Sequence, residues 1–575
     1  MQRVVSLFSI KDIGRAKLGA YLVFSLLFSL TFPFAQWTHR ISLGLHHFIP
    51  EVPFYTACAF LLLLVFDNLS RKASITVPER PVAKRQKGDG ATSSASQPDQ
   101  AKRQLFSRCL SRLKTSLTPD RKMQLLLFAV LAVVYFLNFL LYYPGCGTTD
   151  SDSAISQALG YSPYTRLTSP FHTFVISIIL RIGLIFTDLE GALALFSTVQ
   201  LLATAAVLSY FLCWIKRKGV PSWVFVLCLL FFALNPVVAR FAITMWKDIP
   251  FSLSVLLLMT LLFDVAQSQG ALLRNNRSML IKLLIICFCI LFFRKNGLII
   301  VAGVAVFLLF WLKAKEKLPA ISLLVLLAAS AIIQGPVLTA AGMEPDSFVE
   351  TSALPIQQLT NLVYRGEALS EEQMALMNNI IPEDKLREVY GYHSPDPMKF
   401  SGWFDYDYLD AHKTEFMLTW LELMPSYPKE YLQAWGSLSR GYWYIGEAKW
   451  IVSPAGFARQ GSTNILLEHT GFTWASVGLD TQYEDIRNYP LIYPLFNLGC
   501  LVWMTLASAL LCFNKNSRWK LVCLLPVLLL VFTMLFGAPA TELRYIFAIH
   551  LSLPLLLLLP FLRRQAQPSM KPALP

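Results

Sequence analysis

Long apolar runs recur along the chain, and they decide what it can fold into. The run 192–215 contains no charged side chain. About 20 consecutive apolar residues cross the hydrocarbon core of a bilayer as an α-helix, because a helix satisfies its backbone hydrogen bonds internally. Since 55% of the residues are hydrophobic, 15% are charged and the mean hydropathy is +0.50, these runs predict an all-α, multi-pass membrane protein.

Twelve of the apolar runs are predicted to be transmembrane helices. Another run, 171–186, is short for a span, and we interpret it as a juxtamembrane helix on the outer surface. A full crossing there would place Lys216, Arg217 and Lys218 outside, whereas basic residues tend to remain in the cytoplasm. The predicted spans are 17–35, 53–66, 123–143, 192–215, 223–242, 249–266, 280–293, 297–312, 320–336, 491–513, 521–535 and 545–562.

Charge is distributed unevenly, and its distribution predicts the orientation of the chain. Residues 69–122 contain 13 basic and 4 acidic residues, whereas residues 338–489 contain 10 basic and 21 acidic residues. The basic segment is poor in hydrophobic residues, so we expect a largely disordered cytoplasmic loop and cytoplasmic termini. The formal net charge of +14 therefore reflects membrane orientation, and we expect no binding of nucleic acid.

The spans and loops predict six segments. The acidic segment is expected to be a mostly helical extracytoplasmic domain, because its apolar residues recur at intervals of three and four and Ser370 with Glu372 or Gln373 resembles a helix start. It contains no cysteine, so disulfides cannot stabilise it. The segments are two N-terminal spans (1–68), the basic loop (69–122), a transmembrane core (123–337) with a catalytic loop (144–190), the acidic domain (338–489), the last spans (490–562) and a cytoplasmic tail (563–575).

A polar stretch at 142–173 lies between two apolar runs and carries two aspartates. Asp150 is predicted to act as a general base that accepts a proton from an incoming hydroxyl group. In another interpretation, Asp150 and Asp152 only cap a helix predicted to begin near Ser153. Asp152 is otherwise grouped with the residues that bind substrate. We therefore expect the active site to begin in this stretch.

Asp248 is a second carboxylate predicted on the outer side, in a turn between two spans. In one interpretation it forms a local ion pair with Lys247. In the other it is a catalytic partner of Asp150, and the two carboxylates either bind a divalent cation such as Mg²⁺ or Mn²⁺ or orient the acceptor.

Five basic residues lie near the predicted outer ends of spans, where the positive-inside tendency does not place them. Each one alone is explained by a long side chain that reaches the lipid headgroups. As a set, they predict a binding site for the phosphate of a polyprenyl-phosphate lipid. They are Arg240, Lys247, Arg294, Lys295 and Arg544.

Further polar and aromatic residues are assigned to the predicted site. His172 is either an interface residue or a substrate contact, and Gln157 is grouped with the lipid-phosphate residues. Gln200 is polar within a span, so it is expected to face the bundle interior. Trp443 and Tyr444 either anchor the domain at its core or at the membrane interface, or form an acceptor surface on which sugar rings stack.

Several motifs resemble a family of bacterial multi-pass membrane proteins whose function is uncharacterised and which is similar to GT-C glycosyltransferases. The resemblance runs from about residue 123 to the C-terminus, and the two leading spans with the basic loop look like an addition. The motifs are YPGCGTTDSDSAISQALG, SPFHT, ITMWKD, FFRKNG, PIQQLTNLVYRGEALSEEQ, YPKEYLQAWGSLSRGYWY and ELRYIFA.

The resemblance implies a fold, an activity and a location. In GT-C enzymes the first extracytoplasmic loop holds a catalytic aspartate, juxtamembrane helices follow, and a second acidic residue lies in the next outer loop; Asp150 and Asp248 occupy those positions. It implies inverting transfer of a sugar from a polyprenyl-phosphate donor to a cell-surface glycan or polymer, at the bacterial plasma membrane. The chain departs from the family at Ser169-Pro170-Phe171-His172, where several members have His-Pro-Pro, and Asp150-Ser151-Asp152 is not a certain metal-binding pair.

Two other functions are compatible with the same residues. A lipid-linked glycan flippase or transporter would use the basic and aromatic residues for binding without a carboxylate base. A non-catalytic scaffold of an envelope-synthesis complex would need neither.

Overall fold

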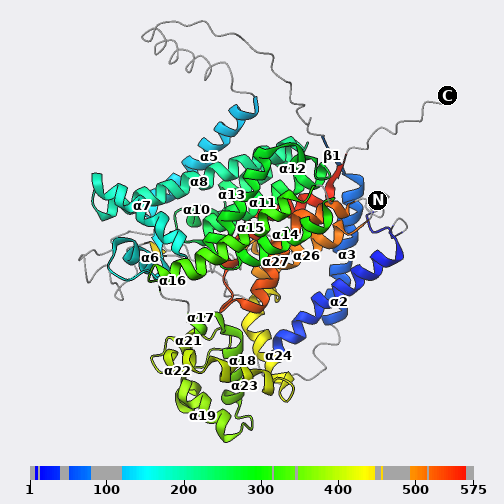
Figure 1. Cartoon of the computed structure of the whole chain (residues 1–575). Coiled ribbons are helices and arrows are strands. Elements are labelled where there is room, and N and C mark those ends of the chain that lie inside the picture. Colours follow the sequence, from blue (N-terminus) through cyan, green and yellow to red (C-terminus); the bar gives the residue numbers. More distant parts are fainter. Residues whose placement is uncertain are drawn as a thin grey trace, which may run out of the picture.

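The computed structural model describes residues 7–10, 13–38, 51–78, 119–166, 168–313, 316–343, 347–446, 455–456, 492–514 and 517–564. Within them the chain is mostly helical, with two small two-stranded sheets. A helical bundle carries a separate helical domain on one side, visible below the bundle in Figure 1. The all-α prediction is confirmed.

Within the part of the chain that the structure describes, the bundle contains eight helices that are long and apolar enough to cross a membrane. The central helix is α11, which is buried on almost all of its faces. The candidate spans are α2 (Arg15–Thr38), α3 (Glu51–Lys72), α5 (Pro119–Leu141), α8 (Leu189–Arg217), α11 (Asp248–Gln267), the continuous segment of α15 (Leu318–Ile332), η3 (Ile333–Val337) and α16 (Leu338–Ala340), η7 (Arg518–Lys520) with α27 (Leu521–Gly537), and η8 (Leu543–Ile546) with α28 (Phe547–Leu558) and η9 (Leu559–Phe561).

Four of the predicted spans form shorter helices, so the number twelve remains a prediction. At 1.5 Å per residue, a helix of 15 residues reaches only about 22 Å, against about 30 Å of hydrocarbon. The juxtamembrane prediction for 171–186 also falls on a short helix, α7. The shorter bundle helices are α7 (Pro170–Phe186), α9 (Ser222–Ala233), α10 (Pro236–Phe241), α12 (Ala271–Asn275), α13 (Arg277–Phe293), α14 (Gly297–Trp311) and α26 (Leu498–Cys512).

The prediction of one continuous helix over 223–242 is wrong. The helix breaks between α9 and α10, where Asn235 caps α10 by accepting hydrogen bonds from the backbone N–H groups of Val237 and Val238 at 3.0 and 3.2 Å. Pro236 occupies the first turn of α10 and has no N–H to donate back into α9.

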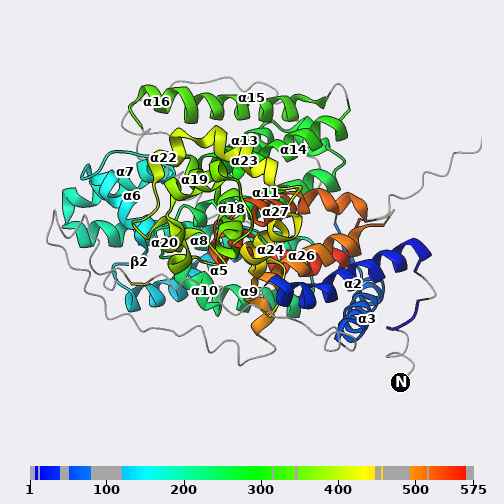
Figure 2. The same cartoon turned by 90° about the horizontal axis from the view of Figure 1, so that it is seen from below.

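The N-terminal hairpin, α2 with α3, packs against the bundle. Figure 2 shows the hairpin and α15 at opposite sides of the bundle. Strand β1 (Ile75–Val77), just after the hairpin, pairs in parallel with β4 (Leu562–Arg564) at the other end of the chain. The predicted disorder of the basic loop concerns mainly residues outside the described ones.

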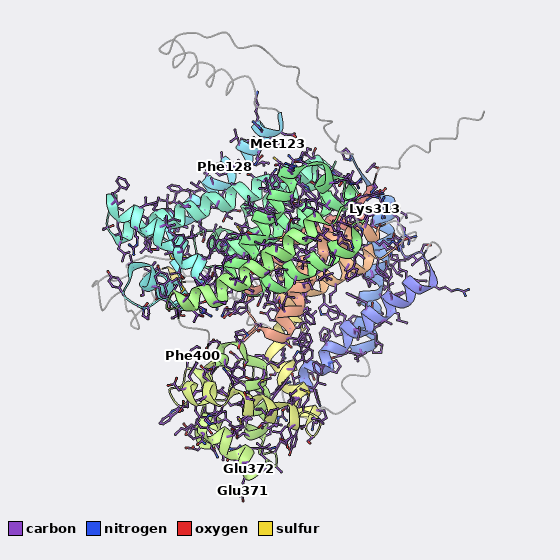
Figure 3. All side chains as sticks on the ribbon, in the orientation of Figure 1. Met123, Phe128, Lys313, Glu371, Glu372 and Phe400 are labelled. Carbon is purple, nitrogen blue, oxygen red and sulfur yellow. The ribbon has the colours of Figure 1, made fainter. Side chains whose placement is uncertain are left out.

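The domain on the side of the bundle covers residues 347–446, and its helical character is confirmed. Helix α19 begins as expected, since Ser370 and Gln373 exchange hydrogen bonds at 3.0 and 3.2 Å in a capping box. In Figure 3, Glu371 and Glu372 lie at the far tip of this domain. Its elements are α17 (Phe348–Thr351), α18 (Ala353–Arg365), α19 (Glu371–Ile380), α20 (Glu383–Val389), α21 (Asp396–Lys399), α22 (Tyr406–Ala411), α23 (Lys413–Leu423), α24 (Pro428–Ser439) and η4 (Arg440–Tyr442).

Candidate functional site: a charged cavity in the bundle

The two segments that carry Asp150 and Asp248 are joined by backbone hydrogen bonds. The N–H of Cys146 donates to the carbonyl oxygen of Ile243 at 3.0 Å, and the N–H of Met245 donates to that of Cys146 at 2.9 Å. Strand β2 (Cys146–Gly147) also pairs with β3 (Ala455–Gly456). Residues almost a hundred positions apart are thereby fixed side by side.

Side chains reinforce this junction at the start of helix α6 (Thr149–Leu159). The indole N–H of Trp246 donates to the hydroxyl of Thr148 at 2.8 Å, and the Ser151 hydroxyl donates to the carbonyl of Met245 at 2.9 Å. Thr148 is the N-cap of α6. The expectation that the helix begins near Ser153 with Asp152 as its cap is therefore wrong, because a hydroxyl four residues earlier takes that role.

Gln200 holds the loop before α11 from the other side. Its side-chain amide lies within the bundle, as predicted, and donates to the carbonyl oxygens of Phe241, Ala242 and Thr244 at 3.3, 3.2 and 2.6 Å. Phe241 is the last residue of α10 and the other two residues follow it, so Gln200 fixes the loop that leads to Lys247.

A cavity of about 180 Å³ lies where these segments meet the ends of α13, α27 and η8. Ser169, Gly537 and Tyr545 contribute to its wall. Its charged lining comprises four cations and two carboxylates, which gives an excess of positive charge. These six residues define the charged cavity: Asp150, Lys247, Asp248, Arg294, Lys295 and Arg544.

Each carboxylate of the charged cavity is paired with an arginine. Arg544 contacts Asp150 through Nη1 at 2.6 Å, and its Nε also contacts Glu542. Arg294 forms an ion pair with Asp248. This pair joins α11 to the end of α13, and Asp248 also interacts electrostatically with its neighbour Lys247.

Tyr545 lies between the two arginines and organises them. The guanidinium carbons of Arg294 and Arg544 lie 4.8 and 4.9 Å from its ring centroid, and Arg544 donates to its hydroxyl at 3.1 Å. Stacking on an aromatic ring holds a guanidinium plane in one orientation. The cationic wall of the cavity is therefore preorganised.

The two aspartates differ sharply in accessibility. The side chain of Asp150 is 46% exposed, whereas that of Asp248 is 2% exposed. Burial raises the pKa of Asp150, but the neighbouring charges of Arg544 and Lys247 outweigh it and hold the pKa below its usual value. Asp150 is thus an ionised carboxylate that a ligand can reach, and Asp248 is a buried counter-ion.

Arg294 and Lys295 belong to a tight turn between α13 and α14. The turn ends at Gly297, where a Cβ atom would overlap the backbone carbonyl oxygen of Ile290. Glycine is required there because the two backbones approach so closely. The Ser169 hydroxyl donates to the carbonyl of Phe292 at 2.6 Å, which ties the start of α7 to the same turn.

Four of the residues predicted to bind the donor do not line the charged cavity. Arg240 is buried with its guanidinium carbon 3.5 Å from the centroid of the Tyr142 ring. His172 is buried, with its ring against Phe196 and Phe293. The other two are Gln157, which accepts a hydrogen bond from the Thr168 hydroxyl at 2.8 Å, and Asp152.

The aromatic pair predicted to bind an acceptor lies away from the charged cavity. The Trp443 ring packs near Phe34 of α2, and its indole N–H donates to Ser439 at 3.1 Å. Tyr444 packs edge-on to Phe32. Both rings therefore contact the N-terminal hairpin, as the alternative interpretation of structural anchors expects.

Three residues of the site were not predicted from the sequence: Ser169, Glu542 and Tyr545. Ser169 is in the SPFHT motif, and the other two flank Arg544 in ELRYIFA. An acidic residue and a tyrosine beside a basic residue at a span end were a usable signal, since an arginine near hydrocarbon requires nearby partners.

The predicted divalent-cation site at Asp150 and Asp248 does not fit this geometry. Each carboxylate already contacts a guanidinium group, which a metal ion would have to displace. The positive charge of Lys247 would also repel the metal ion. Among the described residues, no three His, Cys, Asp or Glu side chains are grouped as metal ligands. The donor set favours an anion in place of a metal.

Residues 165–573 match the model of a family of unknown function (DUF6020). The chain belongs to this family. No curated protein and no solved structure matches the chain. The family match begins after α6, later than the predicted start near residue 123, so Asp150 precedes the matched region and the other five charged cavity residues lie within it.

Proposed function

We propose that the chain is an inverting membrane glycosyltransferase that transfers a sugar from a polyprenyl-phosphate donor to an extracytoplasmic cell-envelope glycan or polymer. The charged cavity carries this proposal, because it combines a preorganised cationic wall with one accessible, ionised carboxylate. The resemblance to GT-C enzymes adds the substrate class. In this proposal the cavity and the domain of α17 to α24 face outward, and both termini are cytoplasmic.

The cationic residues are proposed to bind the phosphate of the donor. Arg294, Lys295 and Arg544 lie at the ends of bundle helices, where a lipid phosphate at the membrane surface would reach them. Guanidinium and ammonium groups form short, charge-assisted hydrogen bonds with phosphate oxygens. They also stabilise the negative charge that develops on the leaving phosphate.

Asp150 is proposed to be the general base. The acceptor hydroxyl oxygen bonds to the anomeric carbon while its proton passes to Asp150. The bond from the anomeric carbon to the phosphate oxygen breaks, and its electron pair leaves with the polyprenyl phosphate. Attack opposite to the leaving group inverts the anomeric configuration. A bound phosphate competes with Asp150 for Arg544, which raises the pKa of the base toward the range that suits proton transfer.

Asp248 is proposed to position Arg294 and not to accept a proton. Its side chain is almost fully buried and already pairs with the arginine. This narrows the predicted catalytic pair to one acting residue, Asp150.

Replacing Asp150 with asparagine tests the enzyme. The full chain in liposomes is given a panel of radiolabelled polyprenyl-phosphate hexoses with envelope glycan fragments as acceptors, and farnesyl phosphate binding is measured in parallel. Loss of a general base lowers transfer by roughly 10² to 10⁴-fold. Binding of farnesyl phosphate should persist. Asp188→Asn is the matched control, because Asp188 caps α8 outside the cavity and asparagine caps equally well.

Lipid movement in the same liposomes and the envelope phenotype of cells separate the alternatives. A flippase or transporter would retain its lipid movement in Asp150→Asn and would catalyse no transfer in any variant. A scaffold would tolerate the loss of Arg294 or Arg544 without a change in envelope phenotype. Near-normal sugar transfer by Asp150→Asn would falsify the proposed enzyme mechanism.

A further inference from the structure

A second cavity, of about 340 Å³, lies between the N-terminal hairpin and the bundle. Side chains of α2, α3, α26 and α28 form its walls, and almost all of them are apolar. We call it the hairpin cavity; its lining includes Phe28, Cys58, Leu62, Trp503, Ala507 and Leu511.

The shape of the hairpin cavity follows from the packing of small residues beside a large one. Trp503 meets the rings of Phe24 and Phe28 edge-on at 5.1 and 5.3 Å, which props α2 away from α26. Cys58 and Ala507 line the space that remains. An apolar void offers water no hydrogen-bond partners, and an empty one forfeits dispersion contacts. In a membrane, a hydrocarbon chain is the filling that matches these walls.

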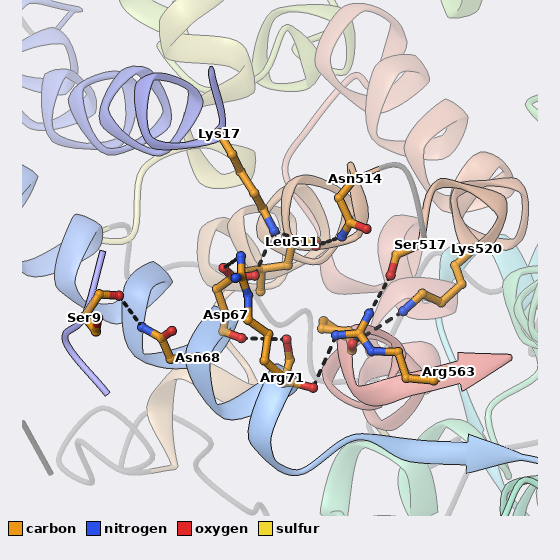
Figure 4. Close-up of polar contacts among 12 residues, drawn as sticks. Ser9, Lys17, Asp67, Asn68, Arg71, Leu511, Asn514, Ser517, Lys520 and Arg563 are labelled. Atoms are coloured by element: carbon orange, nitrogen blue, oxygen red, sulfur yellow. Dashed lines mark hydrogen bonds and ion pairs between the residues drawn. The ribbon is translucent and has the colours of Figure 1, made fainter. Parts of the chain in front are cut away.

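A cluster of basic residues stands at one end of the hairpin cavity. Asp67 pairs with Lys17 at 2.7 Å and with Arg71 at 2.8 Å, and Arg563 donates to the Ser70 carbonyl at 3.3 Å (Figure 4). Lys17 and Arg71 share the carboxylate of Asp67, and Arg563 contributes a third cation beside them, which leaves an excess of positive charge. The side chain of Arg71 is 33% exposed, so a ligand can reach it.

The basic cluster and the hairpin cavity adjoin each other. Leu511 lines the cavity, and its carbonyl oxygen accepts a hydrogen bond from Lys17 at 3.4 Å. Phe66 also lines the cavity and directly precedes Asp67 in α3. An apolar slot that ends in a cationic cluster matches an amphipathic anion.

The basic cluster lies at the opposite membrane surface from the charged cavity. Arg544 lies in η8 at one end of the segment formed by η8, α28 and η9, and Arg563 lies in β4 just past its other end. At about 1.5 Å per residue, that segment separates them by roughly 28 Å, close to the thickness of the hydrocarbon core. A lipid bound at the hairpin is therefore distinct from a donor bound at the charged cavity.

We propose that the hairpin cavity holds an acyl chain of an anionic phospholipid, with its phosphate against Lys17, Arg71 and Arg563. The lipid fills the gap between the hairpin and the bundle and supplies negative charge to the cluster. This inference does not depend on the proposed enzymatic activity.

Filling the cavity tests the acyl site. The full chain is purified from membranes, washed in detergent, and its retained lipid is identified by mass spectrometry. Wild type should retain about one anionic phospholipid per chain, and Cys58→Trp should retain several-fold less because the indole occupies the slot. Leu61→Trp is the matched control, since Leu61 is an exposed residue of the same helix that does not line the cavity. Equal retention in all three proteins, or no retained lipid in wild type, overturns the proposal.

The headgroup is tested by reconstitution. In vesicles of phosphatidylglycerol, the melting temperature of wild type should exceed that in phosphatidylcholine by several degrees, and Arg71→Gln should reduce this difference. Cys58→Trp should reduce it as well while keeping all the cations. If the difference in melting temperature between the two lipids is unchanged in both variants, the anionic lipid acts elsewhere and the proposal is wrong. Equal melting temperatures of wild type in the two lipids would contradict the headgroup assignment.

Discussion

Asp150 and Asp152 are two positions apart in α6, yet their surroundings shift their pKa values in opposite directions. Asp150 is held ionised by Arg544 and Lys247, which overcome the effect of burial on its pKa. Burial raises the pKa of Asp152 to about 7. Near neutral pH, Asp150 is therefore ionised, as an ordinary surface carboxylate is, whereas Asp152 is partly protonated.

At pH 8, replacing Asp152 should raise the stability of the protein, and replacing Asp150 should lower it. Between the ordinary pKa of 3.8 and about 7, the folded protein keeps a proton on Asp152 that the unfolded chain has released. Stability contributed by this group therefore falls as pH rises through that window. Asp152→Asn should raise the melting temperature relative to wild type at pH 8 and have little effect near pH 4. Asp150→Asn should lower it at pH 8, because the favourable pairing with Arg544 is lost. Tryptophan fluorescence melts at the two pH values measure both; equal shifts in the same direction would contradict the assignment.

The buried pair of Arg294 and Asp248 should show strong coupling. Arg294→Gln leaves an uncompensated carboxylate in the bundle, which costs about 3 to 5 kcal/mol when one partner of a buried pair is removed. Arg294→Gln combined with Asp248→Asn should recover much of the stability, because neither charge of the pair remains. Denaturation of the two single variants and the double variant forms a cycle. Additive losses would show that the two side chains do not interact.

Sequence reasoning identified most charged residues of the site but could not choose among them. Basic residues at the predicted outer ends of spans are unusual enough to select Arg294, Lys295 and Arg544. Arg240 satisfies the same criterion, yet it lies against the Tyr142 ring. The direction of a side chain on the short helix α10 depends on a helix break, and charge alone does not report that direction.

At the scale of elements, the turn between α13 and α14 depends on one glycine. Gly297→Ala should displace the turn, because the new Cβ would overlap the Ile290 carbonyl oxygen. We expect a lower melting temperature together with weaker farnesyl phosphate binding, since Arg294 and Lys295 move with the turn. Gly537→Ala is the control: Gly537 lines the charged cavity, but a Cβ atom added there would meet no other atom within 4 Å. Loss of farnesyl phosphate binding in Gly537→Ala, with normal binding in Gly297→Ala, would contradict the prediction.

Hydropathy located the helices better than their ends. The apolar run 223–242 is continuous in hydropathy, but Asn235-Pro236 carries a capping side chain and a missing N–H that split it. Both residues are visible in the sequence, and averaging over a span-length window hid them. The start of α6 differs from the prediction for another reason. Threonine and aspartate are both good N-cap residues, so sequence alone does not decide between Thr148 and the aspartates that follow it.

At the scale of the whole molecule, the two sides of the bundle differ in what they present. Figure 3 places Lys313 and Met123 on the side of the bundle away from the domain that bears Glu371 and Glu372. The positive-inside tendency predicts that the first two face the cytoplasm. The same tendency predicts that the acidic domain faces outward.

Thiol labelling of intact cells tests this orientation. Glu372→Cys should react with a membrane-impermeant maleimide, whereas Lys313→Cys should react only after the membrane is permeabilised. The wild-type chain provides the background from its own cysteines. Labelling of Lys313→Cys but not Glu372→Cys in intact cells would invert the topology and place the charged cavity on the cytoplasmic side.

The number of spans is the property that sequence reasoning determined least well. Among the described residues, eight helices have the length to cross a bilayer alone, and the other predicted spans form short or broken helices. Periodicity and hydropathy report burial in apolar surroundings, but they do not distinguish a helix surrounded by lipid from one enclosed by other helices. The contact between Asp150 and Arg544 could not be predicted from a local sequence pattern either, because most of the chain separates the two residues.

The pairing of β1 with β4 has a consequence for biosynthesis. The two strands come from nearly opposite ends of the chain, so the hairpin emerges first and its partner strand emerges last. At translation rates of about 5 to 20 residues per second, the hairpin waits roughly 25 to 100 s for that partner. During this interval, the face of the hairpin that later packs on the bundle is covered only by lipid or by the insertion machinery. A nascent chain arrested before the last span should therefore expose its hairpin to proteases that cannot cleave the finished protein.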